Sequence, residues 1–220
     1  MLLLRAPAVY PAQGDTWLLT DVLAGETVAP GARVLDVCTG SGALAVAAAR
    51  MGATDVTAID ISRRAVLSCW LNTRCRTLPV RVLRGDLLGP VAGEHFDLVL
   101  ANPPYVPAAG DELPTRGAAR CWDAGTDGRA VLDRLCVELP PALAPGGVLL
   151  MVFSALCGVE RTVRRLEEAG LEASVVARRV EPFGPVMTAR AGMLEARGLL
   201  APGQRYEELV VVRGRAPAPA

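Results

Sequence analysis

The chain has 220 residues, and 51% of them are hydrophobic, which is enough for the core of one α/β domain. Its 23 basic and 23 acidic residues leave a formal net charge of zero. Because proteins that hold nucleic acid through its phosphates usually carry a basic excess, this balance argues against a dedicated nucleic-acid binder.

The cysteines and the N-terminus indicate the compartment. The six cysteines include no CxxC pair, and the single histidine, His95, has no companion ligand, so we expect no metal site. Without a secretory signal, reduced and mostly buried thiols are expected rather than disulfides. The apolar run at residues 1–4 is far too short for a signal sequence or a membrane span. We therefore expect a cytoplasmic protein that does not associate with membranes.

Short runs rich in valine and leucine predict buried strands of a parallel sheet covered on both faces. They lie at residues 33–37, 55–59, 80–83, 96–101 and 147–153. Apolar residues at helical spacing predict helices. These lie at residues 15–23, 42–51, 62–76, 129–143 and 159–169. Asp15 or Thr16 is expected to cap the first helix, and Ser62 the third.

Strands that alternate with helices predict a doubly wound, Rossmann-like α/β fold. Two late strands at residues 173–180 and 208–212, joined by an irregular stretch, predict an antiparallel hairpin at the edge of a mostly parallel, seven-stranded sheet. We expect a single domain over residues 1–213, in which residues 1–30 form a lead-in segment. The Pro/Ala-rich residues 214–220 are expected to be a disordered tail.

The first strand runs directly into a glycine-rich turn that opens a helix. The turn reads Asp36-Val37-Cys38-Thr39-Gly40-Ser41-Gly42. Glycines at such a turn let the backbone approach a ligand closely, in dinucleotide enzymes and methyltransferases alike. Asp36 would repel a pyrophosphate but attract an ammonium group. The turn therefore favours S-adenosylmethionine over a dinucleotide.

Two more acids close the next two strands. Asp60 ends the second strand, where it can accept hydrogen bonds from ribose hydroxyls, as it also would in an NAD enzyme. Asp86, in Gly85-Asp86-Leu87, ends the third strand and can accept from the adenine amino group. Acids at three successive strand ends suit a cofactor that is rich in donors and positively charged.

The fourth strand ends in Asn102-Pro103-Pro104-Tyr105, at the edge where open α/β sheets bind ligands. The two prolines stiffen the backbone and leave its carbonyls free as acceptors. The Asn102 side-chain oxygen and the Pro103 carbonyl can accept both hydrogens of an NH2 group, and Tyr105 can stack on its flat face. Holding both N–H bonds aims the remaining lone-pair density at a methyl donor. The motif predicts methylation of a planar nitrogen.

Taken together, these motifs resemble the HemK/PrmC family of class I methyltransferases, which methylate protein glutamine, typically in translation release factors. The resemblance covers residues 9–213. It rests on Tyr10 with Asp15-Thr16, the turn from Asp36 to Gly42, Asp60, Gly85-Asp86-Leu87, Asn102 to Tyr105, and residues 122–128 (WDAGTDG). The chain is similar to a shorter branch that lacks the N-terminal helical substrate domain.

The resemblance implies roles for individual residues. The cofactor site would be lined by Thr16, Asp36, Cys38, Gly40, Gly42, Asp60, Ile61, Asp86, Leu87 and Asn102. Asn102, Pro103 and Tyr105 would be catalytic, and together with Pro104 they would hold the substrate amide.

The chain departs from the family in two places. Cys38 stands where the family usually has glycine, and residues 190–205 lengthen the usual ending and are a candidate substrate or partner surface. The resemblance also implies a protein substrate, a release factor first of all, and a small activator subunit. Methylation of an RNA or DNA amino group, of a small molecule or of protein lysine remains open, as does a cofactor-binding subunit without catalysis.

Overall fold

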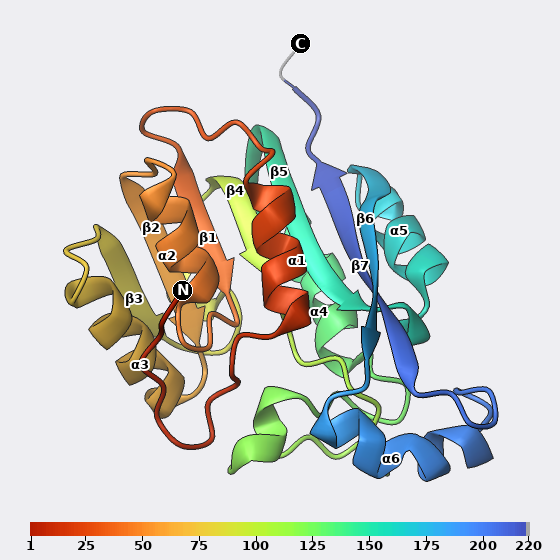
Figure 1. Ribbon diagram of the computed structural model, residues 1–220. Coiled ribbons are helices and arrows are strands. Elements are labelled where there is room, and N and C mark those ends of the chain that lie inside the picture. Colours follow the sequence, from red (N-terminus) through yellow and green to blue (C-terminus); the bar gives the residue numbers. More distant parts are fainter. Residues whose placement is uncertain (219–220) are drawn as a thin grey trace.

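The computed structural model describes residues 1–218, which form one seven-stranded sheet with helices on both faces (Figure 1). The strands are β1 (Arg33–Val37), β2 (Asp55–Asp60), β3 (Val80–Arg84), β4 (Phe96–Ala101), β5 (Leu143–Ser154), β6 (Glu172–Pro182) and β7 (Tyr206–Arg215). Their order is β3-β2-β1-β4-β5-β7-β6. The first five strands are parallel, and β7 pairs antiparallel with both β5 and β6. The predicted fold class is confirmed.

The helices divide between the two faces of the sheet (Figure 1). One face is covered by α1 (Gly14–Leu23), α2 (Ala43–Arg50) and α3 (Arg63–Arg74). The other is covered by α4 (Ala130–Glu138) and α5 (Val159–Glu168). A sixth helix, α6 (Pro185–Ala196), lies beyond the carboxyl ends of the parallel strands. None of these helices, within residues 1–218, is long and apolar enough to cross a membrane.

The central strands carry the core. Leu35 in β1, Leu100 in β4 and Leu150 in β5 have no exposed surface, and Leu100 and Leu150 are register partners. Burying a leucine side chain contributes about 1.5–3 kcal/mol. This rigid centre fixes the strand ends on which the candidate site is built.

The expected caps are partly confirmed. Ser62 precedes α3, and its side-chain oxygen accepts a hydrogen bond from the Ala65 N–H at 3.4 Å. The expectation for α1 is wrong, because its N-cap is Gln13, which makes no side-chain capping bond. Asp15 instead faces the interior and is 3% exposed. The predicted helix at residues 129–143 ends at Glu138, just before two prolines.

The C-terminal part differs most from expectation. The stretch expected to be irregular contains α6, and β7 lies between β5 and the edge strand β6. The hairpin pairing of β6 with β7 is confirmed. Residues 214 and 215, expected in a disordered tail, belong to β7, and the N–H of Ala216 donates to the Gly147 carbonyl at 2.9 Å. The last two residues of that expected tail, 219–220, lie outside the described residues.

Candidate functional site

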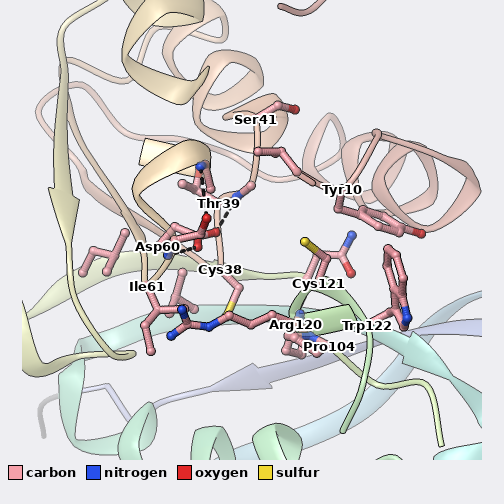
Figure 2. Close-up of a pocket in the computed structure, with 18 of the residues that line it drawn as sticks. Tyr10, Cys38, Thr39, Ser41, Asp60, Ile61, Pro104, Arg120, Cys121 and Trp122 are labelled. Atoms are coloured by element: carbon pink, nitrogen blue, oxygen red, sulfur yellow. Dashed lines mark hydrogen bonds between the residues drawn. The ribbon is translucent and has the colours of Figure 1, made fainter. Parts of the chain in front are cut away.

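A cavity opens at the carboxyl ends of β1 to β4, where the sequence placed the site. Most of the expected residues line it: Thr16, Cys38, Gly40, Asp60, Ile61, Asp86, Leu87, Asn102, Pro103, Pro104 and Tyr105. Figure 2 shows how side chains from the glycine turn, from the end of β2 and from residues 104–122 face this space. The fold therefore gathers motifs that lie far apart in the chain, from Tyr10 to Trp122.

Asp36 does not line the cavity, in contrast to the expected role. Its side chain has no exposed surface, and its Oδ2 accepts hydrogen bonds from the Thr39 hydroxyl at 2.5 Å and the Ala45 N–H at 2.9 Å. Its Oδ1 is buried without a partner among the described residues. Burial raises the pKa of Asp36 to about 7 although these two hydrogen bonds lower it. The geometry makes Asp36 a support beneath the turn.

Gly42 also lies outside the lining. Its φ is +85°, and a Cβ there would come 2.7 Å from the Cys69 Sγ, so glycine is needed for close packing of the turn on α3. Gly40 differs, because no atom lies within 4 Å of the position that a Cβ would take. Cys38 adopts φ +61° although it is not glycine, a conformation that costs about 1 kcal/mol or more. Burial raises the pKa of its thiol well above the usual range.

Asp60 faces the cavity and holds the turn. Its Oδ2 accepts from the Gly40 N–H at 2.9 Å, and its Oδ1 accepts from the Ser62 N–H at 2.8 Å. Burial raises the pKa of Asp60, and these two bonds work against the rise. Each carboxylate oxygen keeps lone pairs for a further donor from a ligand.

Asp86 reaches the cavity, but its carboxylate is already paired. Arg134 of α4 donates to both of its oxygens, at 3.1 and 2.9 Å. Since both side chains are about half exposed, the pair is weak. Leu87 beside it is 6% exposed and presents an apolar surface.

The Asn102 side chain has a fixed orientation. Its Nδ2 donates to the Thr16 Oγ1 at 3.2 Å, and Thr16 is itself held by a hydrogen bond to Asp15. Among the described residues, no hydrogen bond occupies the Asn102 Oδ1 or the Pro103 carbonyl. Two free oxygen acceptors therefore occur at the end of β4.

Tyr105 does not present an exposed ring. It is 7% exposed, and its hydroxyl donates to the Asp15 Oδ2 at 3.0 Å. Tyr10 donates to the same oxygen, also at 3.0 Å. Burial, with Asp15 nearby, raises the pKa of both phenols, so both stay protonated as donors. The central position of Asp15 was missed, because its tyrosine partners lie 5 and 90 residues away.

Arg120 is a second residue that the sequence did not single out. It comes from the 3-10 turn Ala118–Cys121 and lines the cavity, and Figure 2 shows its side chain extending across toward Ile61. Its charge favours the ionised form of Asp60 and so lowers the pKa of that carboxyl. No periodic pattern could have identified a lone arginine in such a turn.

The WDAGTDG segment, residues 122–128, packs beside the Asn-Pro-Pro-Tyr turn. The Val106 N–H donates to the Trp122 carbonyl at 2.7 Å. A Cβ on Gly128 would come 2.4 Å from the Tyr105 carbonyl oxygen, so this glycine is required for the close approach. The α6 helix contacts both the WDAGTDG segment and the residues after the Asn-Pro-Pro-Tyr turn. Its Arg190 forms an ion pair with Asp123 at 2.5 Å and donates a hydrogen bond to the Pro107 carbonyl at 2.9 Å.

Comparison of the sequence with known proteins finds methyltransferases. The family model of the methyltransferase small domain matches residues 8–115. A provisionally named protein N5-glutamine methyltransferase of Methanocaldococcus jannaschii is 33% identical over 188 residues, which cover 86% of this chain and 93% of the relative. A release factor glutamine methyltransferase of Gloeobacter violaceus is 34% identical over 194 residues, which cover 77% of this chain and 67% of the relative.

Solved structures agree on the fold. The E. cuniculi Mtq2-Trm112 complex, described as responsible for methylation of the termination factor eRF1, has a chain that matches with a TM-score of 0.61. The match covers 95% of this chain and 99% of the other at 24% identity, which establishes the shared fold. The sequence matches confirm the resemblance drawn from the motifs: the chain belongs to the HemK/PrmC family of class I methyltransferases.

Proposed function

We propose that this methyltransferase transfers a methyl group from S-adenosylmethionine to the side-chain amide nitrogen of a glutamine in a translation release factor. The observation that carries the proposal is the pair of free acceptors, Asn102 Oδ1 and the Pro103 carbonyl, at the cavity. Relatives named protein N5-glutamine and release factor glutamine methyltransferases support the choice of acceptor.

The residues around the cavity fit the cofactor. The unobstructed backbone at Gly40 leaves room for the methionine part, and Asp60 can accept from the ribose hydroxyls. Ile61 and Leu87 offer apolar surface to the adenine ring. Asp86 can accept from the adenine amino group, and Thr16 and Cys38 complete the lining. When bound, S-adenosylmethionine supplies a methyl group on a positively charged sulfur.

Asp36 and Gly42 act through the shape of the turn. Asp36 accepts hydrogen bonds from Thr39 and Ala45, which tie the turn to the first turn of α2. Gly42 permits contact between that turn and Cys69 of α3. Both are therefore positioning residues and not contacts of the cofactor.

The acceptor amide is held in a fixed plane. Asn102 and Pro103 each accept one N–H of the glutamine side chain, and Thr16 prevents the Asn102 amide from rotating. The cofactor would supply the methyl group to the held nitrogen, which would release one of its two N–H protons to water. Because an amide nitrogen is a weak nucleophile, positioning by these acceptors supplies most of the acceleration.

A protein acceptor fits the surroundings better than a nucleic acid. Asp15, Glu181 and Glu207 line a second cavity, which shares Asp15 and Tyr105 with the first. Its lining contains no basic side chain among the described residues. A phosphodiester backbone would be repelled there. The Mtq2-Trm112 pairing further motivates a small partner subunit for this chain, which co-purification would test.

The experiment is methylation of a purified release factor that carries a Gly-Gly-Gln segment, followed by peptide mass spectrometry. We expect one added methyl group on the glutamine with wild-type protein and none without S-adenosylmethionine. If the protein methylates another substrate but leaves the release factor unmethylated under the same conditions, the proposal is contradicted.

A further inference from the structure

Arg120 is the one basic side chain among the described residues that line the first cavity. It is half-buried, and it comes from the 3-10 turn Ala118–Cys121, outside the sheet. The residues to which the proposed function gives a role toward the cofactor lie at strand ends and in α1, and none of them is a cation. Arg120 therefore brings a positive charge to the cofactor space from a separate segment of the chain.

The backbone that carries Arg120 is held on two sides. The Cys121 Sγ donates to the Ala8 carbonyl at 3.4 Å, which ties the turn to the N-terminal segment. The Trp122 carbonyl accepts from the Val106 N–H at 2.7 Å, directly after the Asn-Pro-Pro-Tyr turn. The point from which the Arg120 side chain extends is thus fixed relative to the cavity.

The guanidinium of Arg120 is largely unpaired. It makes one hydrogen bond, to the exposed Thr115 carbonyl at 3.2 Å, and no ion pair among the described residues. A guanidinium carries five N–H donors, so most of its donors remain available. Arg134, by contrast, already donates to both carboxylate oxygens of Asp86. Of these two arginines, only Arg120 is free to act on a ligand in the cavity.

The Arg120 side chain crosses the cavity toward the end of β2. Figure 2 shows it extending toward Ile61, the residue after Asp60. Burial raises the pKa of the Asp60 carboxyl, and the charge of Arg120 is among the effects that lower it. Yet the two groups form no ion pair, and the Asp60 oxygens accept from backbone N–H groups instead. The guanidinium and the carboxylate therefore face the same space without closing it.

Two apolar side chains line this part of the cavity. Leu87 is buried, whereas Ile61 is 37% exposed although it is large and apolar. A flat heterocycle that packs on these side chains leaves its second face uncovered. A guanidinium is planar and can stack on such a face, where its charge is attracted to the π electrons, whereas a compact ammonium group offers no plane for stacking.

We propose that the Arg120 guanidinium closes over the adenine ring of S-adenosylmethionine, opposite Ile61 and Leu87, and so determines the affinity for the adenosine part of the cofactor. The inference rests on the cofactor of the proposed function and does not depend on its acceptor. Leaving the Thr115 carbonyl costs little, because that hydrogen bond is exposed to water.

The test measures binding to the full-length protein by calorimetry with two ligands. S-Adenosylhomocysteine has the adenosine and the amino-acid parts, whereas 5′-methylthioadenosine lacks the amino-acid part. We expect Arg120→Ala to weaken the binding of both ligands by a similar factor of about ten, because stacking on adenine is lost in both. Arg120→Lys keeps the charge without the plane, so it should recover only part of the affinity.

Arg116→Ala is the matched control. Arg116 is an exposed arginine four residues earlier in the same loop and is not part of the cavity lining, so this variant should bind both ligands as wild-type protein does. Thermal unfolding checks that each variant folds. If Arg120→Ala does not fold, the comparison of Arg120→Lys with wild-type protein decides, and full affinity in Arg120→Lys would contradict stacking.

The outcomes distinguish this inference from the proposed function. It is overturned if Arg120→Ala weakens only S-adenosylhomocysteine, which would place the arginine on the amino-acid part, or if Arg116→Ala causes an equal loss. It is also overturned if 5′-methylthioadenosine does not bind wild-type protein. Unchanged binding in Arg120→Ala, beside methylation of the release factor, removes the role of Arg120 and leaves the proposed function standing. The expected losses without methylation of the release factor support Arg120 and count against the proposed acceptor.

Discussion

The Tyr105 hydroxyl and the Asp15 carboxylate meet at 3.0 Å in the wall between the two cavities. Asp15 also receives the Tyr10 hydroxyl and, through its other oxygen, the Thr16 hydroxyl. Thr16 in turn holds Asn102. One buried carboxylate thus connects the N-terminal segment to the Asn-Pro-Pro-Tyr turn, and this network determines how the acceptor oxygens are presented.

The first prediction concerns this network. Tyr105→Phe removes one hydroxyl donor from Asp15 without changing the ring. We expect the free energy of unfolding to fall by about 1–3 kcal/mol, because a hydrogen bond to a buried charged group is lost. Urea denaturation measures the change. Tyr10 donates to the same carboxylate but is less buried, so Tyr10→Phe should lower the free energy of unfolding by less than Tyr105→Phe does. An equal or larger loss in Tyr10→Phe would contradict this prediction.

A second prediction tests how Asn102 is oriented. Thr16→Val removes the oxygen that accepts from the Asn102 Nδ2 but keeps the size of the side chain. The Asn102 amide can then rotate, so we expect kcat to fall about tenfold while the dissociation constant of S-adenosylmethionine changes little. Thr20→Val, one turn along α1, is the matched control. A loss of cofactor binding as large as the loss of kcat would assign Thr16 to the cofactor instead.

The third prediction concerns the strained turn. Cys38 has φ +61°, which glycine adopts without cost, so Cys38→Gly is expected to raise the free energy of unfolding by about 1 kcal/mol. Cys38→Ala keeps the strained backbone and loses the sulfur, so it should give no gain. Urea unfolding of the three proteins decides the matter, and a Gly variant less stable than the Ala variant would show that thiol packing outweighs the strain.

The fourth prediction concerns pH. Because the pKa of Asp36 is raised to about 7 from an ordinary value near 3.8, the folded protein holds a proton in this range that the unfolded chain releases. The free energy of unfolding should therefore decrease as pH rises from about 4 to 7, by up to about 4 kcal/mol from this group. In Asp36→Asn that part of the slope disappears. Urea unfolding at several pH values measures both slopes, and equal slopes would contradict the assignment.

Much of the fold follows from local patterns. The five parallel strands and the helices before α6 have strong apolar runs or helical spacing, and these signals agree with the packing. The α6 helix was missed although Met187, Ala191 and Leu194 are buried at helical spacing. The prolines and glycines around it obscured this pattern, although Pro185 stands in the first turn, where proline favours the start of a helix.

The candidate site, like the fold, could be predicted only in part from the sequence. Strand ends could be aligned from the sequence, so the position of the cavity was predicted, and most of the residues expected to line it do so. The sequence could not reveal which way a buried acid points: Asp36 turns under the loop, and Asp15 turns inward to two tyrosines. Such orientations depend on partners that are distant in the chain and are fixed only when the strands and helices pack.

The most direct test of the central claim compares catalysis and cofactor binding in Asn102→Ala. Single-turnover methylation of a Gly-Gly-Gln release factor is measured beside calorimetric binding of S-adenosylmethionine, for this variant and for wild-type protein. If the Asn102 oxygen holds the acceptor amide, the rate falls by about 100-fold or more while most of the cofactor affinity remains. A variant that retains the full wild-type rate would contradict the account.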